Sequence, residues 1–472
     1  MVFSSLFFLY AFLPLAILSY YLLNPLLRNL WLVLLSLVFY AWSTGVYVSV
    51  LAISVTFNYL AALTLEPWRG RWPGRAILGV CLAANLSLLA YFKYLSWILG
   101  QLAPDLLSRL PMPQYFGAAP LLGVSFFTFH AISYIVDVHR GRTPAQRNFL
   151  LLTLYMVLFP QLLAGPLILY RDISEQLARR SASPEDVASG LKRFLRGLAK
   201  KVLIADVLAF PVDAVFNSPL QYSSFDLVAF AVGCFGLQMF FDFSGYSDMA
   251  IGLARMFGFH FPENFNYPYV SLSVQEFWQR WHISLSNWFR SYLFFPLAGG
   301  AQGADSLLKV VGVFVLVGFW HGPSWTFLLF GLWNGLWFSA ELGWLGPKLA
   351  PQPVLLRRAY LLGILFVGLL FFRSPSLIHL LLLLRGLATL PGPVCGDLRQ
   401  FLQPDLSCAL MVALLLTTPS FLAWLDPYIQ PTRRRSRQLW EGADVGYHLA
   451  LLLLCTMRLA AASYRPFLYF AF

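Results

Sequence analysis

Long apolar runs follow one another through most of this 472-residue chain, and they constrain its fold more than any other feature. Hydrophobic residues make up 59% of the sequence and charged residues only 11%, whereas about 25% of the residues in a soluble domain are charged. So few charges cannot cover a surface that faces water. The sequence therefore predicts an all-α integral membrane protein and excludes a soluble enzyme, a disordered chain and a secreted disulfide scaffold.

The apolar runs also set the number of helices. A membrane-crossing helix needs roughly 20 mostly apolar residues, and the runs supply about 10–13 helices, some of them short or broken. The many prolines and glycines favour broken or re-entrant helices around a protein-lined interior. We expect a single membrane domain over residues 1–472, with N-terminal helices in 1–110, a core in 115–345 and C-terminal helices in 350–472. The predicted spans are 3–23, 30–42, 46–64, 76–98, 118–138, 202–216, 226–252, 308–320, 323–343, 354–372, 376–391, 406–424 and 446–462.

Arginines gather in two loops, 69–75 and 140–147, that are separated by two predicted spans. Basic loops stay in the cytoplasm, so both loops face that side, and counting back through three spans places the N-terminus outside. The first apolar run lacks a basic leader and a cleavage site, so we expect it to be kept as the first helix. The net charge of +12 follows the same rule and indicates lipid contact, with no nucleic-acid partner.

Residues 149–170 are long enough to cross a membrane, but basic residues flank both ends. A single crossing would put one basic flank on the wrong side. The interior sequence FPQLLAGP holds two prolines and a glycine, which interrupt helices. We therefore predict a re-entrant hairpin, whose irregular backbone requires a cover of protein or a cavity.

The stretch 183–200 predicts a basic amphipathic helix on the cytoplasmic surface. Ser183 is a suitable N-cap, Pro184 suits the first helical position, and Asp186 is an acid in the first turn. Two functions are open for its basic face: contact with lipid headgroups, or docking of an anionic acyl donor. This face consists of Lys192, Arg193, Arg196 and Lys200.

His321 is the strongest catalytic candidate because it is the only ionisable residue between positions 310 and 340. Pro323 disfavours a helical conformation at Gly322 and is suited to the first position of a new helix. The histidine is therefore expected at a helix break, with Trp320 and Trp325 beside it. A break exposes backbone donors that stabilise an oxyanion, although a lone buried histidine is more often a structural core residue.

Two further segments carry polar groups among apolar residues. Residues 275–292 are predicted as one helix, which would turn His282 inward with the apolar residues and place Asn287 on a polar stripe. In 237–250, Asp242, Asp248 and Ser244 lie within one apolar helix, and such charges require partners or a wet cavity. The alternatives are an interfacial helix for the first segment and a cation site for the second.

Together these segments resemble the membrane-bound O-acyltransferase family, and most closely its bacterial branch that O-acetylates alginate. The resemblance covers residues 1–345 in order and weakens beyond about 350. Its motifs are MVFSSLFFLYAFLPL, FYAWS, NLSLLAYFKY, LGVSFFTFHAISYIVDVHRG, FPQLLAGPL, FFDFSGYSDMA, QEFWQRWHISLSNWFRSYLFFPL and GFWHGPSWTFLLFGLWNGLW.

The resemblance implies a central tunnel with two catalytic histidines, an essential His321 and a supporting His282. An acyl group, expected to be acetyl from acetyl-CoA, would enter from the cytoplasm. It would pass through a separate extracytoplasmic acetyltransferase or acceptor protein to a polysaccharide. We expect no metal and no permanently bound cofactor, and a location in the bacterial inner membrane. The supporting residues proposed for the tunnel are Asp242, Ser244, Asn287, Trp320, Trp325 and Asn334.

Two other functions compete with this one. A D-alanyl transferase of teichoic-acid modification belongs to the same family and would take its donor from an acidic carrier protein, which the positive charge of the chain suits. A polysaccharide or lipid transporter would also contain broken helices and intramembrane carboxylates, but the sequence shows no paired repeat. A His321→Ala change separates the classes, because a transporter would keep much of its activity.

Overall fold

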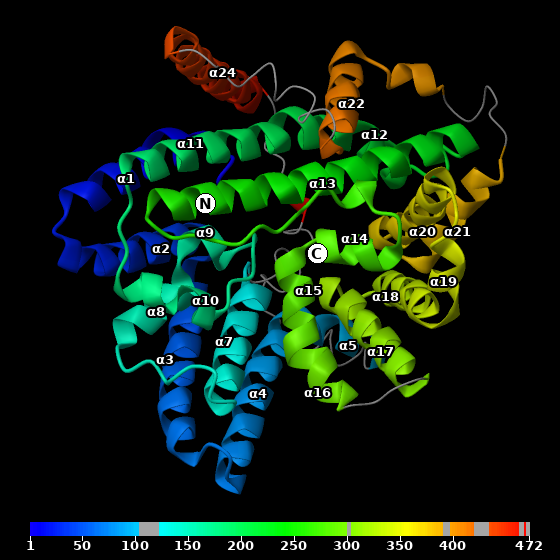
Figure 1. Ribbon diagram of the computed structural model, residues 1–472. Coiled ribbons are helices and arrows are strands. Elements are labelled where there is room, and N and C mark those ends of the chain that lie inside the picture. The colour runs from blue at the N-terminus through cyan, green and yellow to red at the C-terminus, as the bar shows by residue number, and fades with distance from the viewer. Residues whose placement is uncertain (103–121, 300–303, 390–396, 420–433, 462–466, 469–472) are drawn as a thin grey trace. The chain divides into compact units, whose positions relative to one another are not determined.

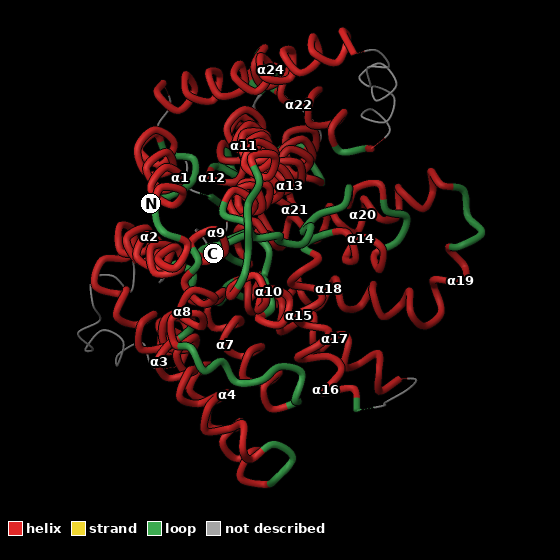
Figure 2. Tube along the Cα trace, turned by 60° about the vertical axis from the view of Figure 1, so that its left-hand side comes forward, coloured by secondary structure: helices red, strands yellow, loops and turns green. Residues whose placement is uncertain are grey.

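The structure is a computed structural model that describes the chain except for residues 103–121, 300–303, 390–396, 420–433, 462–466 and 469–472. All described segments are helices or loops (Figure 2), which confirms the all-α membrane fold. Four shorter apolar helices accompany the spanning candidates, and the predicted total of 10–13 stays a prediction. Five helical stretches are long and apolar enough to cross a membrane: Pro25–Trp68, Trp72–Lys93, Phe225–Met256, Val354–Arg373 and Glu441–Ala461.

The chain forms two compact units that interleave along the sequence. Unit 1 combines Met1–Phe194 with Tyr246–Glu263, and unit 2 combines Leu195–Gly245 with Asn264–Leu468. Helices α11 (Pro184–Ala199) and α13 (Phe225–Met256) contribute residues to both units. The predicted division of a single membrane domain near residues 110 and 350 stays a prediction.

In unit 1, helices α3, α4 and α7 pack side by side (Figure 1). Two buried amides join α3 to α4: Asn85 Nδ2 donates to Asn58 Oδ1 at 2.9 Å, and Asn58 Nδ2 donates to Asn85 Oδ1 at 3.2 Å. Each amide thus satisfies the other, as buried polar groups require. The helices of this unit that precede α11 are α1 (Leu13–Leu22), α2 (Arg28–Thr44), α3 (Val48–Leu65), α4 (Trp72–Lys93), α5 (Leu95–Leu102), α7 (Val124–His139), α8 (Phe149–Val157), α9 (Phe159–Leu162) and α10 (Tyr170–Ala178).

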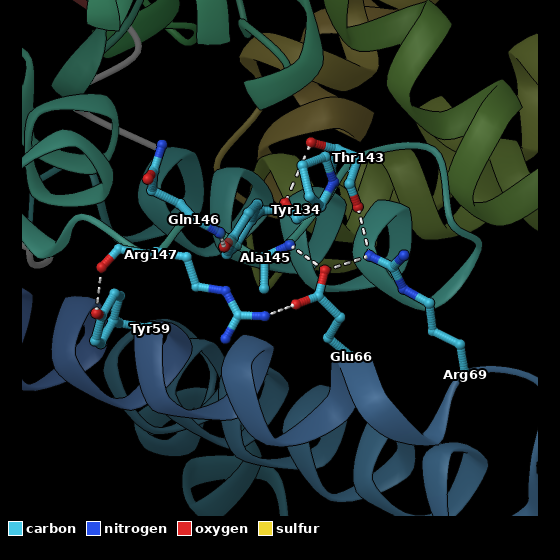
Figure 3. A network of polar contacts seen from close by, with 9 residues as sticks. Tyr59, Glu66, Arg69, Tyr134, Thr143, Ala145, Gln146 and Arg147 are labelled. Atoms are coloured by element: carbon cyan, nitrogen blue, oxygen red, sulfur yellow. Dashed lines mark hydrogen bonds and ion pairs between the residues drawn. The ribbon is translucent and has the colours of Figure 1, made fainter.

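The two arginine-rich loops meet at Glu66 in unit 1 (Figure 3). One carboxylate oxygen of Glu66 accepts hydrogen bonds from the Arg69 guanidinium at 3.1 Å and from the Ala145 backbone N–H at 2.9 Å. Its other oxygen pairs with Arg147, and Arg69 also donates to the Thr143 carbonyl. These contacts hold loops 69–75 and 140–147 together on the same side of the unit.

The broken backbone predicted between 149 and 170 is confirmed. Helix α8 ends at Val157, the four-residue α9 begins at Phe159, and extended chain leads on to α10. Every residue from 159 to 170 is buried in unit 1, as irregular backbone at membrane depth requires. Gln161 donates from its side chain to the Tyr155 carbonyl and so satisfies part of this backbone. The return of the segment to its original side of the membrane stays a prediction.

In unit 2, helices α17 (Ala304–His321) and α18 (Trp325–Ala340) form a tight helical hairpin (Figure 1). Glycines permit the close approach: a Cβ on Gly331 would lie 2.3 Å from the Phe314 carbonyl oxygen, and one on Gly318 would lie 2.2 Å from the Phe327 carbonyl oxygen. The other helices are α12 (Asp206–Asn217), α14 (Val274–Arg280), α15 (Ile283–Phe289), α16 (Phe295–Ala298), α19 (Gly346–Leu349), α20 (Val354–Arg373), α21 (Leu377–Leu387), α22 (Pro404–Leu416) and α24 (Arg434–Ala461).

Candidate active site

His321 is the last residue of α17, and the predicted helix break follows it. The new helix begins two residues later than the sequence indicated, at Trp325: Ser324 is the N-cap of α18, and its Oγ accepts from the Phe327 N–H at 3.2 Å. Pro323 thus lies in the turn before the cap. Only 6% of His321 is exposed, so the imidazole is held inside unit 2.

Aromatic rings surround the His321 imidazole. The Trp320 ring centroid lies 4.7 Å from it and the Phe372 ring 5.1 Å from it. The rings of Phe327 and Phe330 from α18 lie at 6.2 Å and 6.0 Å. A site lined by rings excludes water and strengthens any electrostatic contact with a substrate.

His282 is buried, as predicted, but the continuous helix predicted over 275–292 is wrong. Helix α14 ends at Arg280 and α15 begins at Ile283, with His282 between them as the N-cap of α15. Its backbone has a φ of 43° and a ψ of 57°, in the left-handed region that non-glycine residues seldom adopt. Such a conformation persists only where neighbouring contacts enforce it. The helical periodicity therefore gave the right burial for the wrong reason.

Asn264 holds this junction and was not singled out from the sequence. Its side chain is buried, and Oδ1 lies 3.1 Å from His282 Nδ1, 2.9 Å from Ser284 Oγ and 3.3 Å from the Ser284 backbone nitrogen. The backbone carbonyl oxygen of Asn264 also accepts from the Ile283 N–H at 2.9 Å. Asn264 lies in the loop FPENFNYPY, where no periodicity marks one polar residue above the next.

Aromatic contacts join the two histidine-bearing regions within unit 2. Phe289 of α15 lies 6.3 Å from the ring of Trp320, the neighbour of His321. Trp278 of α14 packs against Phe314 of α17 at 5.5 Å and Phe330 of α18 at 6.4 Å. The structure therefore brings the α14–α15 junction and the α17–α18 turn together in one aromatic core.

Asp242 does have the partner that an acid in an apolar helix requires. Lys201, which is 4% exposed, lies 2.8 Å from Asp242 Oδ1 and 2.8 Å from Asp206 Oδ1. Asp242 Oδ2 accepts from the Leu468 backbone N–H at 2.8 Å. Lys201 was missed because it follows Lys200 directly, yet the helix turns it to the buried side. Its pairing with Asp242 also leaves no observation that favours a cation site.

The C-terminal segment reaches the surroundings of His282 through this acid. Phe467 packs on Phe243 with 5.8 Å between ring centroids, and Phe243 packs edge to face on the His282 imidazole at 4.6 Å. Asp242, next to Phe243 in α13, anchors the same segment at Leu468. Phe467 and Leu468 therefore connect this segment to the surroundings of His282.

The other predicted tunnel residues divide into two groups. Ser244 and Asn334 are buried in unit 2, and Asn334 Nδ2 donates to the Phe330 carbonyl at 2.8 Å. Asn287 and Trp325, by contrast, are exposed, and Asn287 Oδ1 accepts from Arg290 at 2.7 Å. The tunnel itself stays a prediction.

The predicted basic face of α11 is only partly directed outward. Arg193 bonds to Asp248 at 2.8 Å and to Glu263 at 2.6 Å within unit 1, so α13 and the loop after it take up its charge. Arg196 is exposed, whereas Lys192 and Lys200 are half-buried. The capping prediction is confirmed, because Ser183 Oγ accepts from the Asp186 N–H and Asp186 accepts from the Ser183 N–H, each at 3.1 Å.

Comparison with known proteins identifies the class. The family model for the membrane-bound O-acyltransferase family matches residues 127–372, a range that includes both His282 and His321. The chain belongs to this family, and it is an O-acyltransferase of the membrane.

Two named relatives span the whole chain, and a third aligns with about half of it. The probable alginate O-acetylase AlgI of Pseudomonas putida is 35% identical, with 100% of both chains aligned. The peptidoglycan O-acetyltransferase of Helicobacter pylori is 32% identical over 100% of this chain and 98% of its own. The teichoic acid D-alanyltransferase of Streptococcus thermophilus is 28% identical over 48% of this chain and 58% of its own.

Proposed function

We propose that this O-acyltransferase moves an acetyl group from acetyl-CoA in the cytoplasm across the membrane for the O-acetylation of an extracytoplasmic polysaccharide similar to alginate. The main support for this proposal is the pair of buried histidines, His282 and His321, within one aromatic core of unit 2. The full-length similarity to proteins named as polysaccharide O-acetylases supports acetyl as the acyl group. The D-alanyl alternative has weaker support, since that relative aligns with about half of the chain.

The reaction needs a base and a shielded site. His321 takes the proton of the acceptor hydroxyl, the hydroxyl oxygen forms the new ester bond to the acyl carbon, and the thioester carbon–sulfur bond breaks. The proton then passes from the imidazole to the departing thiolate, so the histidine is restored. A neutral imidazole suits this role near pH 7. The aromatic rings around His321 keep water from competing with the acceptor.

We assign loops 69–75 and 140–147 to the cytoplasm and the N-terminus to the outside of a bacterial inner membrane. The support is the Glu66 network, which holds both arginine-rich loops on one side of unit 1 (Figure 3). As a separate assignment, the exposed Arg196 of α11 meets lipid headgroups or the anionic donor. A separate extracytoplasmic protein receives the acetyl group and completes its transfer to the polymer.

The first test is the acetyl-ester content of the surface polysaccharide in cells that carry wild type, His321→Ala or His282→Ala at matched membrane levels. Loss of a general base lowers the rate by roughly 10²–10⁴-fold, so acetyl esters should disappear while the amount of polymer stays constant. The control is His260→Ala, an exposed histidine of unit 1. Normal acetylation in His321→Ala contradicts the mechanism, and loss of the polymer itself points to export.

A second measurement tests the donor and the acceptor. Inverted membrane vesicles that contain the protein, and that enclose an extracytoplasmic protein extract with alginate as the acceptor, are supplied with radiolabelled acetyl-CoA on their outer, formerly cytoplasmic face. Label should become protected inside the vesicles with wild type and not with His321→Ala. Transfer from D-alanyl carrier protein in place of acetyl-CoA overturns the donor assignment. Acetyl esters found only on peptidoglycan in the cellular assay overturn the assigned polymer.

A further inference from the structure

One oxygen atom, Asn264 Oδ1, lies within hydrogen-bond distance of three groups at the α14–α15 junction. They are His282 Nδ1 at 3.1 Å, Ser284 Oγ at 2.9 Å and the Ser284 backbone nitrogen at 3.3 Å. Asn264 is 1% exposed and His282 is 2% exposed. In such a buried setting the hydrogen-bonding roles of all three groups are fixed by one another.

The backbone amide decides these roles. A peptide N–H only donates, so the atom of Asn264 that faces the Ser284 backbone nitrogen is the carbonyl oxygen; a rotated amide would set two donors against each other. An oxygen without a hydrogen only accepts. The nearby His282 Nδ1 must therefore carry the proton that it donates to Asn264. In the neutral imidazole the other nitrogen, Nε2, then holds the lone pair.

The surroundings prevent this arrangement from relaxing. The Asn264 backbone is tied to Ile283 through its carbonyl oxygen, and the Asn266 N–H donates to the Arg280 carbonyl at 2.9 Å. His282 itself has the left-handed backbone, and its carbonyl accepts the first helical bond of α15 from the Ser286 N–H at 3.1 Å. The chain on both sides of the imidazole is thus fixed relative to Asn264.

Two rings complete the enclosure of the imidazole. Phe243 packs edge to face at 4.6 Å, and Phe265 stacks at 6.5 Å. Neither ring carries a charge, and neither accepts the His282 N–H. His282 Nε2 is buried and has no hydrogen-bond partner among the described residues. A buried acceptor without a partner costs free energy, unless a ligand supplies the missing donor.

We propose that Asn264 is a positioning residue that fixes His282 in the Nδ1–H form, so that Nε2 meets the substrate as an acceptor. This inference rests on the proposed function and assigns a direction to the second histidine. Nε2 accepts a hydrogen bond from a donor on the substrate, the acceptor hydroxyl above all, and thereby orients it for attack. Without the Asn264 oxygen the imidazole is free to place its proton on Nε2, where it would repel that donor.

The test compares Asn264→Leu, Asn264→Asp and the control Asn266→Leu in the vesicle assay with acetyl-CoA, across a range of pH. Leucine has a similar size but no acceptor, so activity should fall roughly 10–100-fold, as for other groups that orient a functional imidazole. Asn266→Leu makes the same substitution at an exposed position of the same loop and keeps the backbone N–H bond to Arg280, so its activity should stay within about threefold of wild type. Membrane level and thermal stability are measured for each variant.

Asn264→Asp distinguishes positioning from simple structural support. A carboxylate accepts at the same place but favours the protonated imidazole, so activity should be lost at low pH and return at higher pH. The acid limb of its pH–rate profile should therefore lie at higher pH than that of wild type. A purely structural role would lower the activity of the aspartate variant equally at every pH.

Wild-type activity in Asn264→Leu overturns this inference, as does an aspartate variant that is inactive at every pH while it keeps wild-type stability. A different result indicates failure of the proposed function itself: His321→Ala and His282→Ala both transfer acetyl normally. The two failures are therefore distinguishable in the same experiment.

Discussion

The regions around His282 and His321 hold an imidazole by different means. At the α14–α15 junction, the backbone is left-handed and a buried amide oxygen bonds to Nδ1 of His282. At the α17–α18 turn, His321 ends a helix and lies among the rings of Trp320 and Phe372. Hydrogen bonds fix direction, and ring packing fixes position and removes water. We infer that the first region sets an orientation and the second excludes water.

The largest effect is expected at the ion pair between Lys201 and Asp242, which borders the His282 region. Lys201→Met leaves Asp242 buried without its cation, and removing one partner of a buried ion pair costs roughly 3–5 kcal/mol. The free energy of unfolding in mixed micelles should fall by that amount. The double variant Lys201→Met with Asp242→Asn should recover most of it, because no buried carboxylate is then left at position 242. Lys348→Met, an exposed lysine of unit 2, is the control.

Equal stability of the single and double variants would show that the Lys201–Asp242 pair is not what stabilises this region. In the double variant, a neutral amide replaces the charged carboxylate that accepts from the Leu468 N–H in wild type. We therefore expect it to regain stability before it regains acetyl transfer.

The next largest effect is expected where α17 and α18 pack closely, in the His321 region. Gly331→Ala would place a Cβ 2.3 Å from the Phe314 carbonyl oxygen. This distance is too short for two non-bonded atoms, so α17 and α18 must separate. Overpacking of this kind costs roughly 1–3 kcal/mol. Because the turn carries His321, acetyl transfer should fall together with thermal stability. Gly312→Ala is the matched control in α17, since its Cβ would meet nothing within 4 Å.

Loss of activity with no loss of stability in Gly331→Ala would point instead to a substrate contact at this glycine. A destabilised Gly312→Ala would contradict the account as well, because alanine is the better helix former at an open position. The comparison between the two glycines thus isolates the close approach of the helices.

The sequence predicted the backbone of the His321 region better than that of the His282 region, for a physical reason. The break after His321 is encoded locally by Gly322–Pro323, which act on their own backbone and their neighbours. The break at His282 depends on Asn264, and the burial of Lys201 depends on Asp242, so both require contacts between distant segments. Local patterns carry no information about such pairs, and the pattern over 275–292 favoured one continuous helix.

The same limit applies to the predicted supporting residues. Asn287 and Trp325 lie one turn or less from buried polar or aromatic positions, yet both side chains are exposed. A small rotation of a short helix decides which residues face inward, and α15 has only seven residues. The burial of Asp242 and Ser244 was easier to predict, because α13 is long and apolar around them.

A smaller effect on the free energy of unfolding is expected from substitutions of the two histidines themselves. Glycine tolerates the left-handed backbone that alanine resists by roughly 1–2 kcal/mol, so His282→Gly should be more stable than His282→Ala. At His321 the order should reverse by about 0.5–1 kcal/mol, because glycine weakens a helix. All four variants should lack acetyl transfer. The same preference at both positions, measured as the free energy of unfolding, would contradict the backbone assignment at one of them.

The smallest effect tests a helix cap in unit 1, whereas both histidine regions belong to unit 2. Hydrogen bonds from the Ser183 N–H and hydroxyl lower the pKa of Asp186 below its ordinary value, and Arg255 assists. An acid with a lowered pKa stabilises the fold above its ordinary pKa of about 3.9, and this stability is lost as the pH falls further. Wild type should therefore have a higher Tm than Asp186→Asn at pH 6. The difference should shrink steadily below about pH 4, while both proteins transfer acetyl equally at neutral pH. A difference in Tm that is independent of pH would mean that the charge of Asp186 plays no part in this cap.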